Sequence, residues 1–219
     1  MTHILFLAKA DDRNAQEAYV FLKNNFTNVD GHFGAWGEPL PYADELHYLQ
    51  PDYTISYLSR WIIPEAILKN SKIAALNFHP APPEYPGFAP NNFALYEDAK
   101  DFGVTCHHME AKVDTGPIVA VKRFPIFHTD SIETLQQRTY TNQLALFYEV
   151  MGTILRGDPL LTTTDKWKDK VYTRKQFEQL NHITMDMDKK EVERRIRATS
   201  FGKFQPSIEL HGFRFELKK

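Results

Sequence analysis

The apolar run Ile4-Leu5-Phe6-Leu7-Ala8 decides the fold that we expect for this chain. Five apolar residues in a row, without polar alternation, are typical of a parallel strand that is buried on both faces. Asp11-Asp12 follows as a helix N-cap, and apolar residues then recur at helical spacing from Ala15 to Leu22. The start of the chain therefore predicts a strand followed by a helix that packs on a parallel sheet.

The alternation of strands and helices continues along the chain. Further strands are expected at 53–58, 73–78, 104–109 and 118–126, and helices at 64–70, 91–100 and 131–155. Residues 28–41 have no clean period and are interpreted as a loop or a degraded strand. This order predicts an α/β fold with a Rossmann-like, doubly wound, mostly parallel sheet. The segment Lys9–Asn14 contains no Gly, so neither the dinucleotide fingerprint nor a P-loop follows the first strand.

The composition changes after Pro159. Residues 161–170 are polar and predict a linker, and residues 171–180 and 189–198 have helical or turn-like patterns. His211-Gly212 lies between two short apolar runs, which predicts a β-hairpin. We therefore expect a catalytic domain over residues 1–158, and a linker with a small C-terminal helix and hairpin over residues 159–219.

Length, charge and cysteine content exclude several classes of function. The 219 residues are 42% hydrophobic and 25% charged, which suits a globular domain. The formal net charge of −2 argues against a nucleic-acid partner. The single cysteine, Cys106, excludes a disulfide framework within the chain and a four-cysteine zinc site, and it is expected to be a buried apolar residue. We predict no metal site, no membrane partner and no secretory leader, and hence a cytoplasmic protein.

The segment from Asn77 to Asn91 carries the chemistry. Asn77 and His79 are two residues apart at the end of an expected strand, so they share one face at the carboxyl edge of the sheet. An amide offers a fixed donor, and an imidazole offers a titratable base. Asp114, in the turn at 112–117, is the third candidate. A carboxylate next to His79 is expected to raise the pKa of the imidazole and to fix its tautomer.

Four motifs together resemble the catalytic domain of the formyltransferases over residues 1–155. They are Asn77-x-His79-Pro80, Tyr85-Pro86-Gly87, Gly103-Val104-Thr105-x-His107 and Val113-Asp114-x-Gly116. The resemblance implies that a formyl group moves from N10-formyltetrahydrofolate to an amine, with Asn77, His79 and Asp114 as the catalytic residues. It also implies that the backbone of Arg60-Trp61-Ile62-Ile63 and the turn at Val113 hold the pterin ring of the donor.

The chain resembles most the members that formylate nucleotide-linked amino sugars. The candidate substrate-binding residues are Tyr85, Pro86, Gly87, Phe88 and Asn92. The predicted acceptor is an amino-dideoxy sugar, carried on thymidine diphosphate and used for a bacterial surface glycan such as O-antigen. The C-terminal extension resembles the part of several sugar enzymes that helps to form a homodimer.

Other acceptors remain as alternatives. Enzymes that formylate glycinamide ribonucleotide have a Gly-rich first loop for the phosphate, whereas Lys9-Ala10-Asp11-Asp12 carries two carboxylates here. The methionyl-tRNA enzymes are longer and more basic. The alternatives kept open are phosphoribosylglycinamide formylation, hydrolysis of the donor, and an inactive domain that binds folate or a nucleotide.

Further charged and aromatic residues have two interpretations each. Arg194, Arg195 and Arg197 either contact a diphosphate or form a solvated or interface face of a helix. His107 and His108 point to opposite faces of a strand, and a structural role is expected for both, although one of them can border the site.

Overall fold

The computed structural model describes residues 2–41, 43–202 and 204–218. The elements follow the chain in this order: β1 His3–Lys9, α1 Arg13–Asn25, β2 Asn28–Gly34, α2 Ala43–Tyr48, β3 Tyr53–Tyr57, α3 Glu65–Lys69, β4 Ala74–His79, α4 Pro90–Tyr96, β5 Asp101–His108, β6 Ile118–Pro125, α5 Ile132–Arg156, α6 Arg174–Leu180, β7 His182–Ile183, α7 Lys189–Thr199, β8 Ser207–Leu210 and β9 Phe213–Glu216. The predicted alternation is confirmed. The sequence did not predict α2 and β7, because both are too short to leave a periodic pattern.

The central sheet has six strands in the order β2-β1-β3-β4-β5-β6. Strands β1 to β4 are parallel to one another, whereas β5 is antiparallel to β4 and β6 is antiparallel to β5. The predicted Rossmann-like, mostly parallel sheet is therefore confirmed, with an antiparallel edge. The segment interpreted as a loop or degraded strand is the edge strand β2. The chain winds outward from β1 in both directions, so the switch point, where such sheets bind ligands, lies between β1 and β3.

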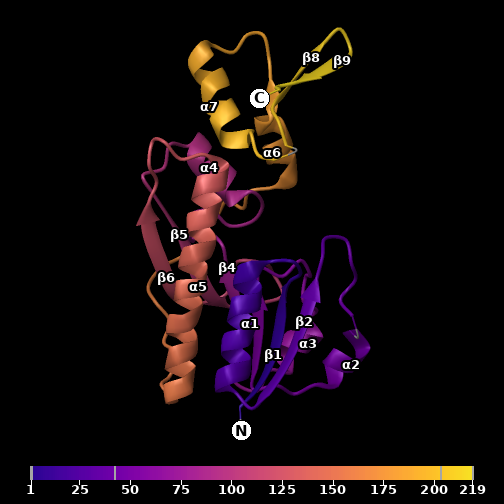
Figure 1. Ribbon diagram of the computed structural model, residues 1–219, viewed down its shortest axis with the longest axis vertical. Coiled ribbons are helices and arrows are strands. Elements are labelled where there is room, and N and C mark those ends of the chain that lie inside the picture. The colour runs from indigo at the N-terminus through magenta and orange to yellow at the C-terminus, as the bar shows by residue number, and fades with distance from the viewer. Residues whose placement is uncertain (1, 42, 203, 219) are drawn as a thin grey trace.

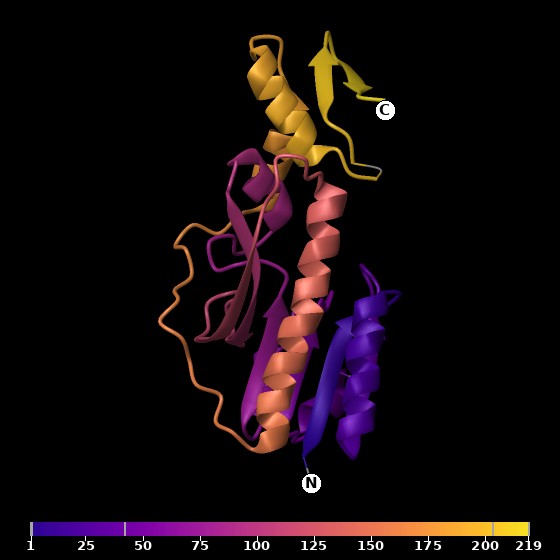
Figure 2. The same cartoon turned by 60° about the vertical axis from the view of Figure 1, so that its left-hand side comes forward.

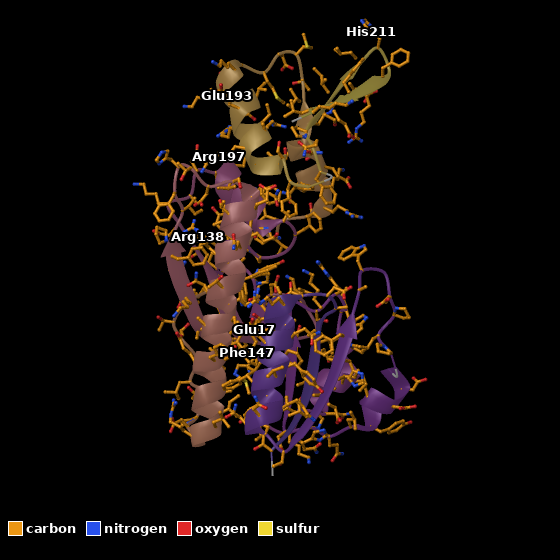
Figure 3. The ribbon with its side chains drawn as sticks, in the orientation of Figure 1. Glu17, Arg138, Phe147, Glu193, Arg197 and His211 are labelled. Atoms are coloured by element: carbon orange, nitrogen blue, oxygen red, sulfur yellow. The ribbon has the colours of Figure 1, made fainter. Side chains whose placement is uncertain are left out.

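Helices cover both faces of the sheet, as Figure 1 shows. Ile4 and Phe6 of β1 pack in a core cluster with α1 and α5, whereas Leu5 and Leu7 pack in a second layer with α2 and α3. Phe147 of α5, labelled in Figure 3, is fully buried in the first of these layers. The continuous apolar run at the start of the chain is thus explained, because successive side chains of β1 enter opposite cores.

Helix α5 begins and ends with strong local signals. The Ser131 hydroxyl and the Thr134 side chain form a capping box at its start, and Gly157 ends it with a φ of 74°. The chain then turns back and runs past β6 toward the other end of the molecule, as Figure 2 shows. None of the described helices is both long enough and apolar enough to cross a membrane.

The C-terminal part consists of α6, α7 and a three-stranded sheet in the order β7-β8-β9, which confirms the predicted hairpin. It docks on α4, where the Asn92 side chain donates to the carbonyl of Ala198 at 2.7 Å. Arg197 of α7 donates to the carbonyls of Phe127 and Asp130, next to the start of α5 (Figure 3). These bonds favour the interface interpretation of the arginine cluster. The division at residue 158 stays a prediction, and one core cluster joins residues from both sides of it.

Candidate active site

A cleft of about 520 Å³ opens at the carboxyl edge of the parallel strands. It is lined by Lys9 at the end of β1, by residues after β3, by the end of β4, and by the turn that precedes β6. Its volume is within the range of about 300–1,000 Å³ that small-molecule sites occupy. The cleft therefore lies where the topology of the sheet predicts a ligand.

The three predicted catalytic side chains converge in this cleft. Asn77 and His79 lie at the end of β4, and Asp114 lies in the turn between β5 and β6. The Nδ1 atom of His79 is 3.4 Å from Oδ1 of Asp114, and both side chains are buried. The backbone of Asp114 has a φ of 52°, in the left-handed region. A non-glycine residue in this region costs free energy and is often found where a side chain is aimed at a site.

The carboxylate of Asp114 is held on one oxygen and unpartnered on the other. Oδ2 accepts a hydrogen bond from the Gly87 N–H at 3.0 Å, while the buried Oδ1 accepts none in the described part of the chain. Burial alone would raise the pKa of Asp114, but the nearby His79 and His107 and the bond from Gly87 lower it to about 2. Asp114 is therefore charged, with a free acceptor directed at the imidazoles.

The surroundings of His79 have two opposing effects on its pKa. Its Nε2 is 3.3 Å from the carbonyl of Tyr85, and its Nδ1 faces Asp114. Burial lowers the pKa of His79 below its ordinary value, and the nearby Asp114 only partly offsets this effect. Asp114 raises the pKa of His79, as expected, but the cost of burying a charged ring outweighs the attraction of the carboxylate, so the pKa is lowered overall.

His107 belongs to the site, although a structural role was expected for it. Its Nδ1–H donates to the carbonyl of His108 at 2.8 Å, so its Nε2 accepts from the Asn77 amide at 3.1 Å. This pair of bonds fixes the orientation of the Asn77 amide and leaves its second N–H for a ligand. The side chain of His108 does not line the cleft. The Gly-Val-Thr-x-His motif contained His107. However, alternation along a strand shows only that His107 and His108 point to opposite faces, and not which of the two faces the site.

All five residues predicted to hold the pterin line the cleft: Arg60, Trp61, Ile62, Ile63 and Val113. Ile62 is 80% exposed and Val113 is 56% exposed. Two exposed apolar side chains on segments that line the same cleft offer walls for a flat ring. The guanidinium of Arg60 lies over the ring of Trp36 at the same cleft.

The predicted substrate-binding residues divide into two groups. Gly87 and Phe88 line the cleft. The ring of Tyr85 is buried in a core cluster and its hydroxyl donates to Glu97, while the Asn92 amide is used by the Ala198 carbonyl. Neither Tyr85, Pro86 nor Asn92 lines the cleft, so their placement supports a role in shaping the loop.

The first loop differs from what its sequence suggested. Asp12 caps α1, and its other oxygen accepts from the ammonium of Lys9 at 2.9 Å. The charge of Asp12 is therefore balanced within the chain, and only part of the expected repulsion toward a phosphate remains. Cys106 is fully buried, and burial raises the pKa of its thiol. No group of three or more potential metal ligands occurs among the described residues.

Known proteins share a family profile and a fold with this chain. The profile of the formyl transferase family matches residues 38–151. A methionyl-tRNA formyltransferase from Ehrlichia chaffeensis is 30% identical over 71% of this chain and 50% of its own length. A sugar N-formyltransferase from a Shewanella species superposes with a TM-score of 0.80 at 17% identity, over 100% of this chain and 97% of that chain.

A third relative was solved with ligands. The N-formyltransferase from Helicobacter canadensis, in complex with folinic acid and dTDP-3-aminofucose, superposes with a TM-score of 0.75 at 18% identity, over 97% of this chain and 85% of that chain. These likenesses show a shared fold. The chain spans about half the length of the curated relatives that it matches.

Proposed function

Because the chain belongs to the formyl transferase family, we propose that it moves a formyl group from N10-formyltetrahydrofolate to the amine of a nucleotide-linked sugar. The observation that carries this proposal is the cleft in which Asn77, His79 and Asp114 meet at the carboxyl edge of the sheet. A fixed amide donor can stabilise an oxyanion, and a buried imidazole next to a charged carboxylate can move a proton, which together serve acyl transfer to an amine.

The reaction follows from the roles of these groups. The neutral amine attacks the formyl carbon, and the free N–H of Asn77 stabilises the oxyanion that forms on the formyl oxygen. His79 takes a proton from the attacking nitrogen, and the protonated ring then donates to the unpartnered oxygen of Asp114 and to the Tyr85 carbonyl. The protonated His79 then gives its proton to N10 of the folate as the bond from the formyl carbon to N10 breaks, which leaves the N-formyl product, tetrahydrofolate and a neutral His79.

The donor is proposed to bind with its pterin between the segment 60–63 and the turn at Val113. Both segments line the cleft, and each carries an exposed apolar side chain, Ile62 and Val113. Isothermal calorimetry with folinic acid tests this part alone. Saturable binding at micromolar to millimolar concentration is expected, and an absence of heat at millimolar folinic acid would contradict it.

A nucleotide-linked amino-dideoxy sugar is proposed as the acceptor, with thymidine diphosphate as the carrier and a surface glycan as its use. Two observations support this choice. The superposition with the Shewanella sugar enzyme includes the C-terminal extension, whereas the methionyl-tRNA relative aligns over 71% of the chain. The formal net charge of −2 also disfavours a polyanionic acceptor such as tRNA. We place this reaction in the cytoplasm.

A panel of acceptors tests the proposal directly. The enzyme is incubated with N10-formyltetrahydrofolate and, separately, with 3-amino and 4-amino dTDP-dideoxy sugars, glycinamide ribonucleotide, methionyl-tRNA or buffer. Mass spectrometry then measures the formylated product. Formylation of a dTDP-amino sugar is expected. Formylation of glycinamide ribonucleotide alone would contradict the proposed acceptor but not the proposed reaction. The structure leaves room for that acceptor, because Lys9 balances the charge of Asp12 in the first loop. Loss of the formyl group in buffer alone would indicate a hydrolase.

A further inference from the structure

The segment between α5 and α6, residues 157–173, is a strap over the back of the active site. Residues 161–170 of this segment were predicted to be a polar linker, but backbone hydrogen bonds hold the strap at several points. The N–H of Thr163 donates to the Ile118 carbonyl at 2.7 Å, and the N–H of Lys168 donates to the Pro83 carbonyl at 2.9 Å. The strap therefore joins β6 to the proline-rich loop of the site.

The end of the strap is tied to the same loop at two more points. The N–H of Tyr172 donates to the Pro86 carbonyl at 3.0 Å, and the N–H of Phe88 donates to the Tyr172 carbonyl at 2.9 Å. The Tyr172 ring is 2% exposed, and its hydroxyl donates to Glu97. Hydrogen bonds on both sides of its middle part hold the strap in one position.

Trp167 lies in the middle of the strap and contacts three parts of the site. Its indole N–H donates to the carbonyl of Gly116, in the turn that carries Asp114, at 2.8 Å. Its ring is nearly perpendicular to the ring of His107, with centroids 4.9 Å apart. It has a similar edge contact with His79 at 5.7 Å. One side chain thus touches both imidazoles and the turn that carries the carboxylate.

The indole lies behind the imidazoles. His79 and His107 line the cleft, whereas Trp167 does not, so the rings are between the indole and the ligand space. Gly116, the acceptor of the indole N–H, packs so closely that an added Cβ would be 1.9 Å from the His108 carbonyl oxygen. The anchor point of Trp167 is therefore rigid.

We propose that Trp167 is a positioning residue for formyl transfer, because its indole holds the two imidazoles and the Asp114 turn in one arrangement and excludes water behind them. This inference rests on the proposed function for its kinetic readout. Because the indole does not line the cleft, its removal is expected to act on the chemical step and not on binding. A misplacement of about 1 Å in a catalytic group can cost about 100-fold in rate.

The test compares four substitutions in the full chain. Trp167→Ala and Trp167→Leu remove the aromatic ring, and Trp167→Phe retains a ring without the N–H. Tyr172→Phe is the matched control, since it removes two side-chain hydrogen bonds of the same strap, to Glu97 and from Lys168, and neither of them involves an imidazole. We expect kcat to fall about 10- to 100-fold in the Ala and Leu variants, with the KM of donor and acceptor within about threefold. The Phe variant and the control are expected to retain kcat within about threefold.

Two kinetic results would overturn the proposal. One is an unchanged kcat per folded molecule in the Ala or Leu variant, even where the melting temperature falls. The other is a loss that appears only in KM. The Leu variant serves if the Ala variant does not fold.

Nitrogen-15 spectra of the imidazoles test the same proposal without turnover. In the wild type, His107 is expected to show a single tautomer with the proton on Nδ1. The Ala or Leu variant is expected to show averaged tautomers, and an unchanged spectrum would overturn the proposal. If the wild type transfers no formyl group to any acceptor, the proposed function fails, and these spectra still decide the role of Trp167.

Discussion

At the scale of single residues, His79 is the group on which the proposed chemistry depends most. His79→Asn retains a polar side chain but removes the base that receives the amine proton, so we expect kcat to fall by at least about 100-fold. Steady-state assays of formyl transfer measure kcat, and calorimetry with folinic acid is expected to show unchanged donor binding. His108→Asn is the matched control, because His108 is a neighbouring histidine outside the cleft. Near-normal turnover in the His79 variant would refute the assignment.

The charge state of His79 leads to a second prediction at this scale. Burial, opposed only in part by Asp114, lowers the pKa of His79 from its ordinary value of 6.5. The neutral ring is the active base, so kcat is expected to be level near pH 7 and to fall with an acid limb centred below 6.5. Asp114→Asn removes a charge that raises this pKa, so the His79 titration seen by NMR is expected to move to still lower pH. An acid limb above 6.5, or a shift of that titration to higher pH, would contradict this prediction.

At the scale of elements, the proline-rich loop and the strap fit together through Gly87. This residue has a φ of 94°, and an added Cβ would be 2.4 Å from the carbonyl oxygen of Tyr172. Gly37 has a similar φ of 87° but open space around it, which makes it a matched control. We expect Gly37→Ala to cost about 1–2 kcal/mol of stability from its backbone alone. Gly87→Ala is expected to cost more, because the strap must also move. Urea denaturation measures the free energy of unfolding of both variants. Equal losses would show that the close contact between Gly87 and Tyr172 does not contribute to stability.

The elements also show how far the sequence could predict this protein. The strands were predictable because β1 and β4 are largely apolar runs with clear ends. The position of the candidate site at the carboxyl edge of the sheet was predictable from the spacing of Asn77 and His79. The role of Trp167 was not predictable, since a single tryptophan in a polar stretch has no periodicity and its partners are distant in sequence. The lowered pKa of His79 was not predictable for a related reason. A carboxylate can be read from a motif, but the depth of burial depends on the whole packed structure.

At the scale of the whole molecule, the C-terminal part is continuous with the catalytic part. One core cluster contains Phe93 and Leu135 from the first part and Tyr172, Leu180 and Ala198 from the second. The strap and the α4–α7 contact join the two parts at separate places. The hairpin at the far end is different, because among the described residues β9 pairs only with β8 and its side chains are exposed. This edge of the small sheet is open to a partner strand.

We propose that a second copy of the chain pairs along β9 to form a homodimer. Phe213 and Phe215 are 70% and 53% exposed, and as residues two apart on a strand they share one face. Antiparallel pairing of two β9 strands would satisfy the free backbone groups of the edge and bury these rings in a symmetric interface.

Sedimentation velocity at micromolar concentration is expected to give twice the mass of the chain. Phe213→Glu places a charge in the interface and is expected to give a monomer with normal activity per chain, since every residue that lines the cleft lies between Lys9 and Tyr140. Met185→Glu, at an exposed position of the same C-terminal part, is expected to remain dimeric. A monomeric wild type would rule the dimer out, and a dimeric Phe213 variant would place the interface elsewhere.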